Sequence, residues 1–217
     1  MLSFSIKEFL LVLESYNLAI WPIQIFAYVL VILVLFFSFK PTKYSPKIVL
    51  AILSFFWLFT GIVFCFIYWV PSHLFGYMFG ICFVFQGLMF LYSIGRSDIT
   101  IGSRNTIYTL IGILFVVYAI MGYQLYGYYL GHIYPEFFAV GLVPCPTVIF
   151  TFGIFLIING KIPIKYLIIP MFSSIGGILA AYNGIYEDVG LVIVGISGTV
   201  IIILRDAHAK AKTISIN

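Results

Sequence analysis

The chain alternates long apolar stretches with short polar ones, and the apolar stretches approach the length needed to cross a bilayer. A spanning helix needs about 20 apolar residues, at 1.5 Å each, to cover about 30 Å of hydrocarbon. The pattern therefore predicts an all-α, polytopic membrane protein with a bundle of seven transmembrane helices. The seven stretches are residues 18–39, 48–69, 74–94, 107–128, 137–158, 166–186 and 189–204.

Charged residues fall between these stretches, and within them only near the ends. A charge at mid-bilayer costs about 3 kcal/mol on insertion scales, so this distribution favours every predicted span. Composition agrees, because 63% of the 217 residues are hydrophobic and 8% are charged, whereas soluble domains carry about 25% charged residues. Lipid is therefore the expected solvent for this chain.

The first residues form a separate feature. Ser5 and Glu8 have the spacing of a capping box, and an apolar face follows. The residues of that face are Ile6, Phe9, Leu10 and Leu13. We predict an amphipathic helix over residues 1–17 that lies in the outer membrane interface, and a simple extension of the first spanning helix is the open alternative. Residues 18–204 would form the transmembrane domain, and residues 205–217 a cytoplasmic tail.

Basic residues occupy alternate polar segments and predict the orientation. Ten of the eleven lysines and arginines lie on one side of the predicted bundle, and Lys7 alone lies on the other. The ten are Lys40, Lys43, Lys47, Arg96, Arg104, Lys161, Lys165, Arg205, Lys210 and Lys212. The positive-inside rule places them in the cytoplasm. We therefore predict a plasma (inner) membrane protein with its N-terminus outside and its C-terminus cytoplasmic.

Tyrosines gather at the predicted outer boundary. They are Tyr16, Tyr68, Tyr123, Tyr126, Tyr128, Tyr129, Tyr134, Tyr182 and Tyr186. An aromatic belt at the level of the lipid headgroups explains such a distribution. The inner boundary holds fewer tyrosines, so a vestibule lined by some of the outer rings is the alternative.

Several landmarks resemble a known family. They are Tyr16-Asn17-Leu18-Ala19-Ile20-Trp21-Pro22-Ile23-Gln24, Phe79-Gly80-Ile81-Cys82-Phe83-Val84-Phe85-Gln86-Gly87, Tyr134-Pro135 and Pro144-Cys145-Pro146-Thr147-Val148-Ile149-Phe150-Thr151-Phe152-Gly153. The chain resembles the uncharacterised prokaryotic family catalogued as domain of unknown function sixty sixty-four, from about residue 4 to about residue 204. The resemblance implies a multi-pass membrane protein, and it implies no activity and no catalytic residues.

The strongest local anomaly is Pro144-Cys145-Pro146-Thr147, inside the fifth apolar stretch. Each proline lacks an N–H and clashes with the carbonyl four residues earlier in a helix interior. Helices broken at such depth line binding sites in transporters. A packing kink that Thr147 or a neighbour satisfies is the alternative.

Other uncharged polar residues occur at comparable depth, and an amide in hydrocarbon needs a hydrogen-bond partner. These residues are Gln24, Cys82, Gln86, Gln124 and Asn183. With the Pro144–Thr147 segment they predict a polar pocket in the outer half of the bundle, and polar contacts that merely join helices are the alternative. The candidate pocket is thus Gln24, Cys82, Gln86, Gln124, Pro144, Cys145, Pro146, Thr147 and Asn183.

Other chemistries find less in the sequence. His73, His132, Glu136 and Cys145 could approach one another near the outer face, but their spacing is not that of a metal site. The chain has three cysteines and no CxxC pair, so we expect no disulfide framework. The acidic pair Glu187-Asp188 opens the last helix, where the helix dipole favours negative charge. We expect no catalytic residue, no metal and no cofactor.

The sequence therefore favours a transporter or facilitator of a small, mostly neutral solute. The alternatives are a non-transporting sensor or assembly partner, and a metal-handling or redox protein. The lipid bilayer and a small solute are the expected partners, and a homo-oligomer is left open. The basic residues are dispersed, so we do not expect the chain to bind nucleic acid. Pro22 and Pro144 precede Lys40 and Lys161 by similar distances, which suggests a 3+1+3 repeat of helices.

Overall fold

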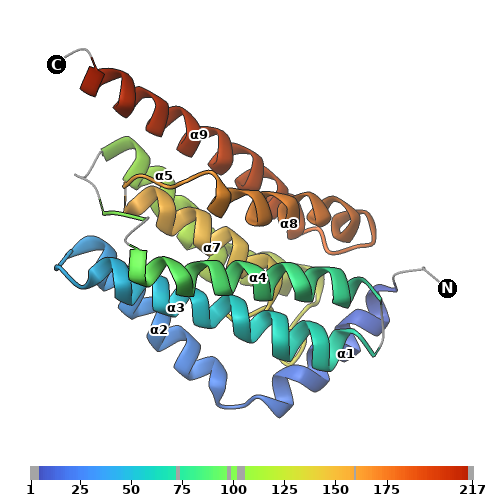
Figure 1. Ribbon diagram of the computed structural model, residues 1–217. Helices are drawn as coiled ribbons and strands as arrows, with labels where there is room; N and C mark the ends of the chain where they lie inside the picture. The colour runs from blue at the N-terminus through green and yellow to red at the C-terminus, as the bar shows by residue number, and fades with distance from the viewer. Residues whose placement is uncertain (1–4, 72–73, 97–98, 102–105, 159, 215–217) are drawn as a thin grey trace.

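The fold is a bundle of helices, shown by a computed structural model (Figure 1) that describes residues 5–71, 74–96, 99–101, 106–158 and 160–214. Within these ranges every regular element is helical. The elements are α1 (Ile6–Ala19), α2 (Ile23–Phe39), α3 (Ser45–Phe59), η1 (Thr60–Trp69), α4 (Phe75–Arg96), α5 (Thr106–Val117), η2 (Tyr118–Gly122), α6 (Tyr123–Leu130), α7 (Pro144–Ile157), α8 (Lys165–Tyr182) and α9 (Asp188–Ile214). The predicted all-α class is confirmed.

Five helices in the described part of the chain are long and apolar enough to cross a membrane. They are Ser45–Trp69, Phe75–Arg96, Ile107–Leu130, Lys165–Tyr182 and Asp188–Ala209. The first joins α3 to η1, and the third joins α5, η2 and α6 into one continuous helix. Five of the seven predicted stretches thus correspond to helices in the described part of the chain, and one of these, α8, continues through Pro170.

The first predicted span, 18–39, is not one helix. The chain bends by 86° between α1 and α2, and α2 begins at Ile23, directly after Pro22. A proline lacks the N–H that a continuous helix would use, so the break falls where the sequence carries that residue. α2 has 17 residues, and the bent pair α1–α2 counts as a sixth candidate span only when taken together.

The predicted helix over residues 137–158 begins only at Pro144, and α7 has 14 residues. Val143 is extended, with φ −125° and ψ 145°, as expected for a residue before a proline. Pro144 and Pro146 lie in the first turn, where a helix has no internal use for the missing N–H groups. The two prolines therefore start a helix and do not kink one.

α7 is the central helix of the bundle. It contacts α2, α3, α5, α8 and α9, and Figure 1 shows it running between the upper pair α8–α9 and the lower helices. All of its residues except Cys145 are buried. A helix covered on every side needs no polar face, which explains why its sequence is apolar all round.

Two π-helical segments interrupt the long helices, at Thr60–Trp69 and at Tyr118–Gly122. Hydrophobic periodicity does not reveal them, because the apolar pattern continues through both. Single-turn π segments are frequent near functional sites. Here they place Trp69 and Tyr118 at the same end of the bundle as α1.

The bundle has two chemically different ends. We call the end with α1, residues 131–143 and the α8–α9 turn the tyrosine-rich end, and the opposite end the basic end. At the basic end the buried Arg205 donates hydrogen bonds to the carbonyl oxygens of Phe155 (3.0 Å) and Gly160 (2.5 Å). α9 extends to Ile214, beyond the predicted end at residue 204. Arg104 lies outside the described residues.

Candidate functional site

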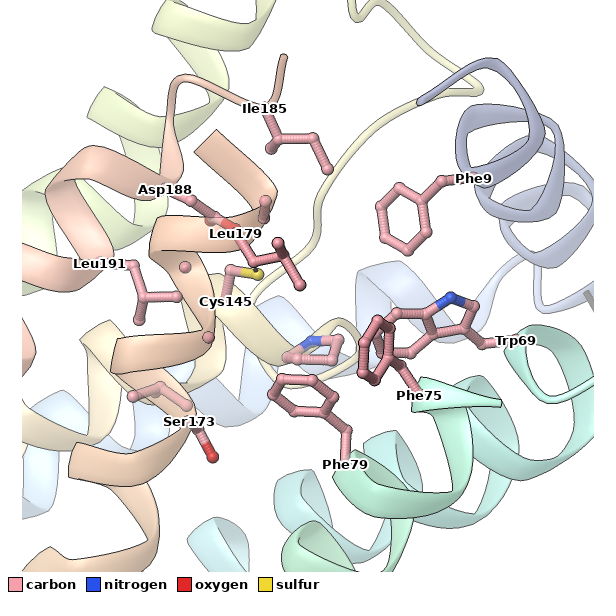
Figure 2. Close-up of a pocket in the computed structure, with 15 residues that line it drawn as sticks. Phe9, Trp69, Phe75, Phe79, Cys145, Ser173, Leu179, Ile185, Asp188 and Leu191 are labelled. Atoms are coloured by element: carbon pink, nitrogen blue, oxygen red, sulfur yellow. Dashed lines mark hydrogen bonds between the residues drawn. The ribbon is translucent and has the colours of Figure 1, made fainter. Parts of the chain in front are cut away.

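A cavity of about 60 Å³ lies near the tyrosine-rich end, where the first turn of α7 faces the first turn of α9. Helices α1, η1, α4, α7, α8 and α9 all contribute to its wall. Figure 2 shows aromatic rings on one side and Cys145 with Asp188 on the other. Leu179 belongs to the wall and is 48% exposed, so the cavity lies against the surface beside α8.

The aromatic side of the cavity consists of Phe9, Trp69, Phe75 and Phe79. The ring centroids of Phe9 and Trp69 are 5.5 Å apart, and those of Trp69 and Phe79 are also 5.5 Å apart. Such separations are typical of packed aromatic pairs. Phe9 comes from α1, whereas the other rings come from η1 and α4, which follow each other in sequence. Through Trp69 the rings of Phe9 and Phe79 form a continuous set.

The polar side of the cavity consists of Asp188, Cys145 and Ser173. The Cys145 thiol donates to Oδ2 of Asp188 over 3.3 Å. Asp188 is 1% exposed and Ser173 is 4% exposed. The Ser173 hydroxyl has no hydrogen-bond partner. A buried carboxyl and an unpartnered hydroxyl thus face an otherwise apolar space.

Asp188 is held in place by its position and by a tyrosine. It is the first residue of α9, and a helix N-terminus favours a negative charge through the helix dipole. The α8–α9 turn reaches this point through Gly184, whose φ of +109° suits glycine. The buried Tyr123 of α6 donates a hydrogen bond to Oδ1 of Asp188, so both carboxyl oxygens have a donor.

A second acidic side chain lies next to the first but points elsewhere. Oε1 of Glu187 is 2.6 Å from Nδ1 of His132, and the Tyr118 hydroxyl donates to the Glu187 carbonyl over 2.8 Å. The hydrogen bond that His132 donates to Glu187 raises the pKa of His132 above its ordinary value. His132 thereby joins residues 131–143 to the start of α9.

Of the predicted pocket residues, Pro144 and Cys145 line the cavity. Pro146 and Thr147 are buried in α7 below it. The Thr147 hydroxyl accepts a hydrogen bond from the Gly141 N–H at 2.8 Å and donates to the Val143 carbonyl at 2.6 Å. Thr147 therefore provides hydrogen-bond partners for the non-helical backbone that precedes α7.

The other predicted pocket residues lie away from the cavity wall. Gln24 donates to the Asn17 carbonyl, and Gln124 donates to the Phe138 carbonyl. Gln86 donates to the Tyr166 carbonyl over 3.4 Å, and Asn183 donates to the Leu179 carbonyl at the end of α8. The amides join backbone segments to one another. Cys82 is a free, half-buried cysteine of α4.

Sequence reasoning did not place Asp188, Ser173, Tyr123 or the aromatic wall at the pocket. The sequence gives Asp188 only a role at the dipole of the last helix, although two adjacent acids before an apolar stretch are a visible signal. Ser173 is an ordinary polar residue of an apolar helix by pattern, and the rings are indistinguishable from an aromatic belt. Their meeting point depends on helix packing, which the pattern does not encode.

In the described part of the chain, no three His, Cys, Asp or Glu side chains lie close enough together to hold a metal ion. His132 pairs with Glu187 and Cys145 with Asp188, so these side chains form two separate pairs. His73 lies outside the described residues. What the arrangement offers chemically is a buried hydrogen-bond acceptor, a hydroxyl and aromatic faces.

Over the residues that the structure describes, the fold defines an all-helical protein with five helices long and apolar enough to cross a membrane. The chain belongs to a family of unknown function, DUF6064, whose model matches residues 6–213. This confirms the resemblance seen in the sequence. No curated protein and no solved structure matches the chain.

Proposed function

We propose that this chain is a multi-pass membrane protein that transports a small solute, or facilitates its passage, by way of the cavity at Cys145 and Asp188. The carrying observation is a cavity with buried polar groups at the first turn of the central helix α7. Small-molecule sites are concave and mostly apolar, with a few polar groups that orient the ligand. Ser173, whose buried hydroxyl has no hydrogen-bond partner, is one of the residues that line this space.

The proposed topology has seven crossings, with α2 and α7 as the two short ones. At 1.5 Å per residue the 14 residues of α7 cover about 21 Å, and the preceding segment 137–143, which is buried from Phe138 onward, would complete the crossing. Non-helical backbone is tolerated at membrane depth where protein covers it, and in this segment Tyr16 donates to the Leu142 carbonyl and Asn17 to the Phe137 carbonyl. The N-terminus would lie outside and the C-terminus in the cytoplasm, with α1 in the outer interface and a 3+1+3 order of helices.

Passage from the cavity to the basic end requires a rearrangement. Below Cys145, the side chains of Phe150, Phe152 and Phe155 on α7 are fully buried. The cavity would therefore be a binding site that is closed toward the cytoplasm. Transport would then proceed by movement of neighbouring helices relative to α7, and we assign no catalytic step to the protein.

Uptake into proteoliposomes tests the proposal, with Cys145 as a built-in probe of the route. We expect uptake of at least one small solute from a panel of urea, glycerol and small amines. In a Cys82→Ser variant, methyl methanethiosulfonate should block uptake by modifying Cys145, because Cys65 is fully buried. The Cys145→Ser variant should keep its uptake after the same treatment.

Two results would contradict the proposal. One is the absence of uptake for every solute in the panel by protein that remains folded in the vesicles. The other is equal block of the Cys82→Ser and Cys145→Ser variants, which would place the route elsewhere. Reporter tags at both ends test the topology, and detection of both ends in one compartment would exclude an odd number of crossings.

A further inference from the structure

We propose that the cavity binds a small organic cation, an amine with its charged nitrogen at Asp188 and its carbon atoms against the aromatic wall. This inference rests on the proposed function in taking the cavity as the solute site. It replaces the mostly neutral solute expected from sequence, because that expectation did not place a carboxyl group in the pocket.

The carboxyl side of the cavity presents the buried Asp188 without a cationic partner among the described residues. Both oxygens of Asp188 accept hydrogen bonds, from Tyr123 and from Cys145. Burial opposes ionisation of Asp188, whereas the donors to both oxygens and the N-terminus of α9 favour it, and a cation bound in the cavity would add to the second group. Among the described residues no lysine, arginine or histidine forms an ion pair with Asp188. A buried carboxylate is stable when a cation pairs with it, and the adjacent space can hold one.

The opposite side of the cavity suits the rest of such a molecule. Ring faces attract cations through their quadrupole, and tryptophan does so most strongly. Phe9, Trp69 and Phe79 form a continuous set of rings across from Asp188 (Figure 2). A carboxylate facing several aromatic rings selects an ammonium group that carries methyl or methylene groups, since each part finds its own partner.

Ser173 adds a third contact. Its hydroxyl is buried, lines the cavity and has no hydrogen-bond partner. A buried hydroxyl without a partner loses the hydrogen bonds it had in water. An ammonium N–H or a hydroxyl on the ligand would restore one, so a ligand with a second polar group is compatible with the site.

The size of the cavity limits the ligand. A single water needs about one probe sphere of space, and the cavity of about 60 Å³ gives room for a small group only. Methylated and short-chain amines fit this space, whereas a lipid headgroup with its glycerol does not.

A pair of isosteres tests the charge without any mutation. Calorimetric titration of the full chain in detergent with tert-butylammonium and with tert-butanol compares a cation with a neutral molecule of the same shape. We expect the ammonium to bind at least tenfold more tightly. Equal affinity of the two, or no binding of either, would overturn the inference.

Matched variants test the residues. Asp188→Asn removes the charge and should abolish the preference for tert-butylammonium over tert-butanol. Glu8→Gln removes a carboxylate from an exposed position of α1 at the same end, and should leave the preference unchanged. Phe79→Leu keeps an apolar wall without the ring, and should weaken the ammonium more than the alcohol. A preference that survives Asp188→Asn would overturn the assignment of Asp188.

Binding and uptake distinguish this inference from the proposed function. If tert-butylammonium binds but does not enter proteoliposomes, the transport proposal fails and the cation site stands. If neutral solutes enter and amines show no advantage in binding or uptake, the cation site fails and transport stands.

Discussion

The Tyr123 hydroxyl lies 2.5 Å from Oδ1 of Asp188, although the two residues are 65 positions apart. Both side chains are buried. The contact joins the last turns of the long helix Ile107–Leu130 to the first turn of α9. It therefore positions the carboxyl group that faces the cavity, and it depends on a tyrosine that the sequence pattern assigns to an outer aromatic belt.

We expect Tyr123→Phe to lower the stability of the folded protein by about 1.5–3 kcal/mol, because a buried carboxyl group loses a hydrogen-bond donor. Thermal unfolding in detergent measures the change. Tyr126→Phe is the control, since Tyr126 lies on the same helix and is 43% exposed. An equal shift in both variants would show that the Tyr123 hydroxyl contributes nothing specific.

The long helices were predictable because each is a long run of apolar residues. A proline does not by itself end such a run, because α8 continues through Pro170. The errors fall at Pro22 and Pro144, where a proline inside an apolar run starts a helix. Hydropathy does not separate a helix from buried extended backbone, and residues 138–143 are both apolar and buried. The sequence therefore predicts that these residues avoid water, and packing decides their conformation.

The candidate site was predictable only in part. Cys145 stood out because two prolines flank it, and it lines the cavity. Asp188 could not be placed there from sequence, because its role follows from the start of α9 lying beside the start of α7. Tyr16 and Tyr123 read as belt residues, yet both are fully buried, while Tyr129 and Tyr182 are exposed as a belt requires. The sequence pattern predicts how deep in the membrane an aromatic ring lies. It does not predict whether the ring points into the bundle or out of it.

Thr147 provides a test of the segment before α7. Thr147→Val keeps the shape but leaves the Gly141 N–H and the Val143 carbonyl without their present partner. We expect a loss of about 1–3 kcal/mol in the free energy of unfolding, measured by thermal unfolding in detergent. Thr147→Ser keeps the hydroxyl and should lose less. If serine and valine are equally destabilising, packing of the methyl group accounts for the effect.

Arg205 provides a test at the basic end. Its guanidinium group bonds the carbonyls of Phe155 and Gly160 and the carboxylate of Asp206. Lysine keeps the charge but lacks the planar fork, so Arg205→Lys should cost about 1–3 kcal/mol of stability. Lys47→Gln changes an exposed charge at the same end and should have little effect on the unfolding temperature. If Arg205→Lys leaves the unfolding temperature unchanged, the positive charge alone matters at this position.

The pair of His132 and Glu187 should make stability depend on pH. The hydrogen bond to Glu187 raises the pKa of His132 above its ordinary value of 6.5, with a further contribution from the charges of Glu187 and Glu136. The folded state therefore holds the proton more tightly than the unfolded state. The resulting stabilisation is fully present below a pH of about 6.5, and it is lost as the pH rises through the raised pKa.

Unfolding temperatures in detergent, measured from about pH 6 to about pH 9, should fall in the unaltered protein and fall less in His132→Gln. His208→Gln is the control, since His208 is exposed on α9, and it should keep the slope of the unaltered protein. A His132→Gln variant with that same slope would show that the proton responsible is held elsewhere.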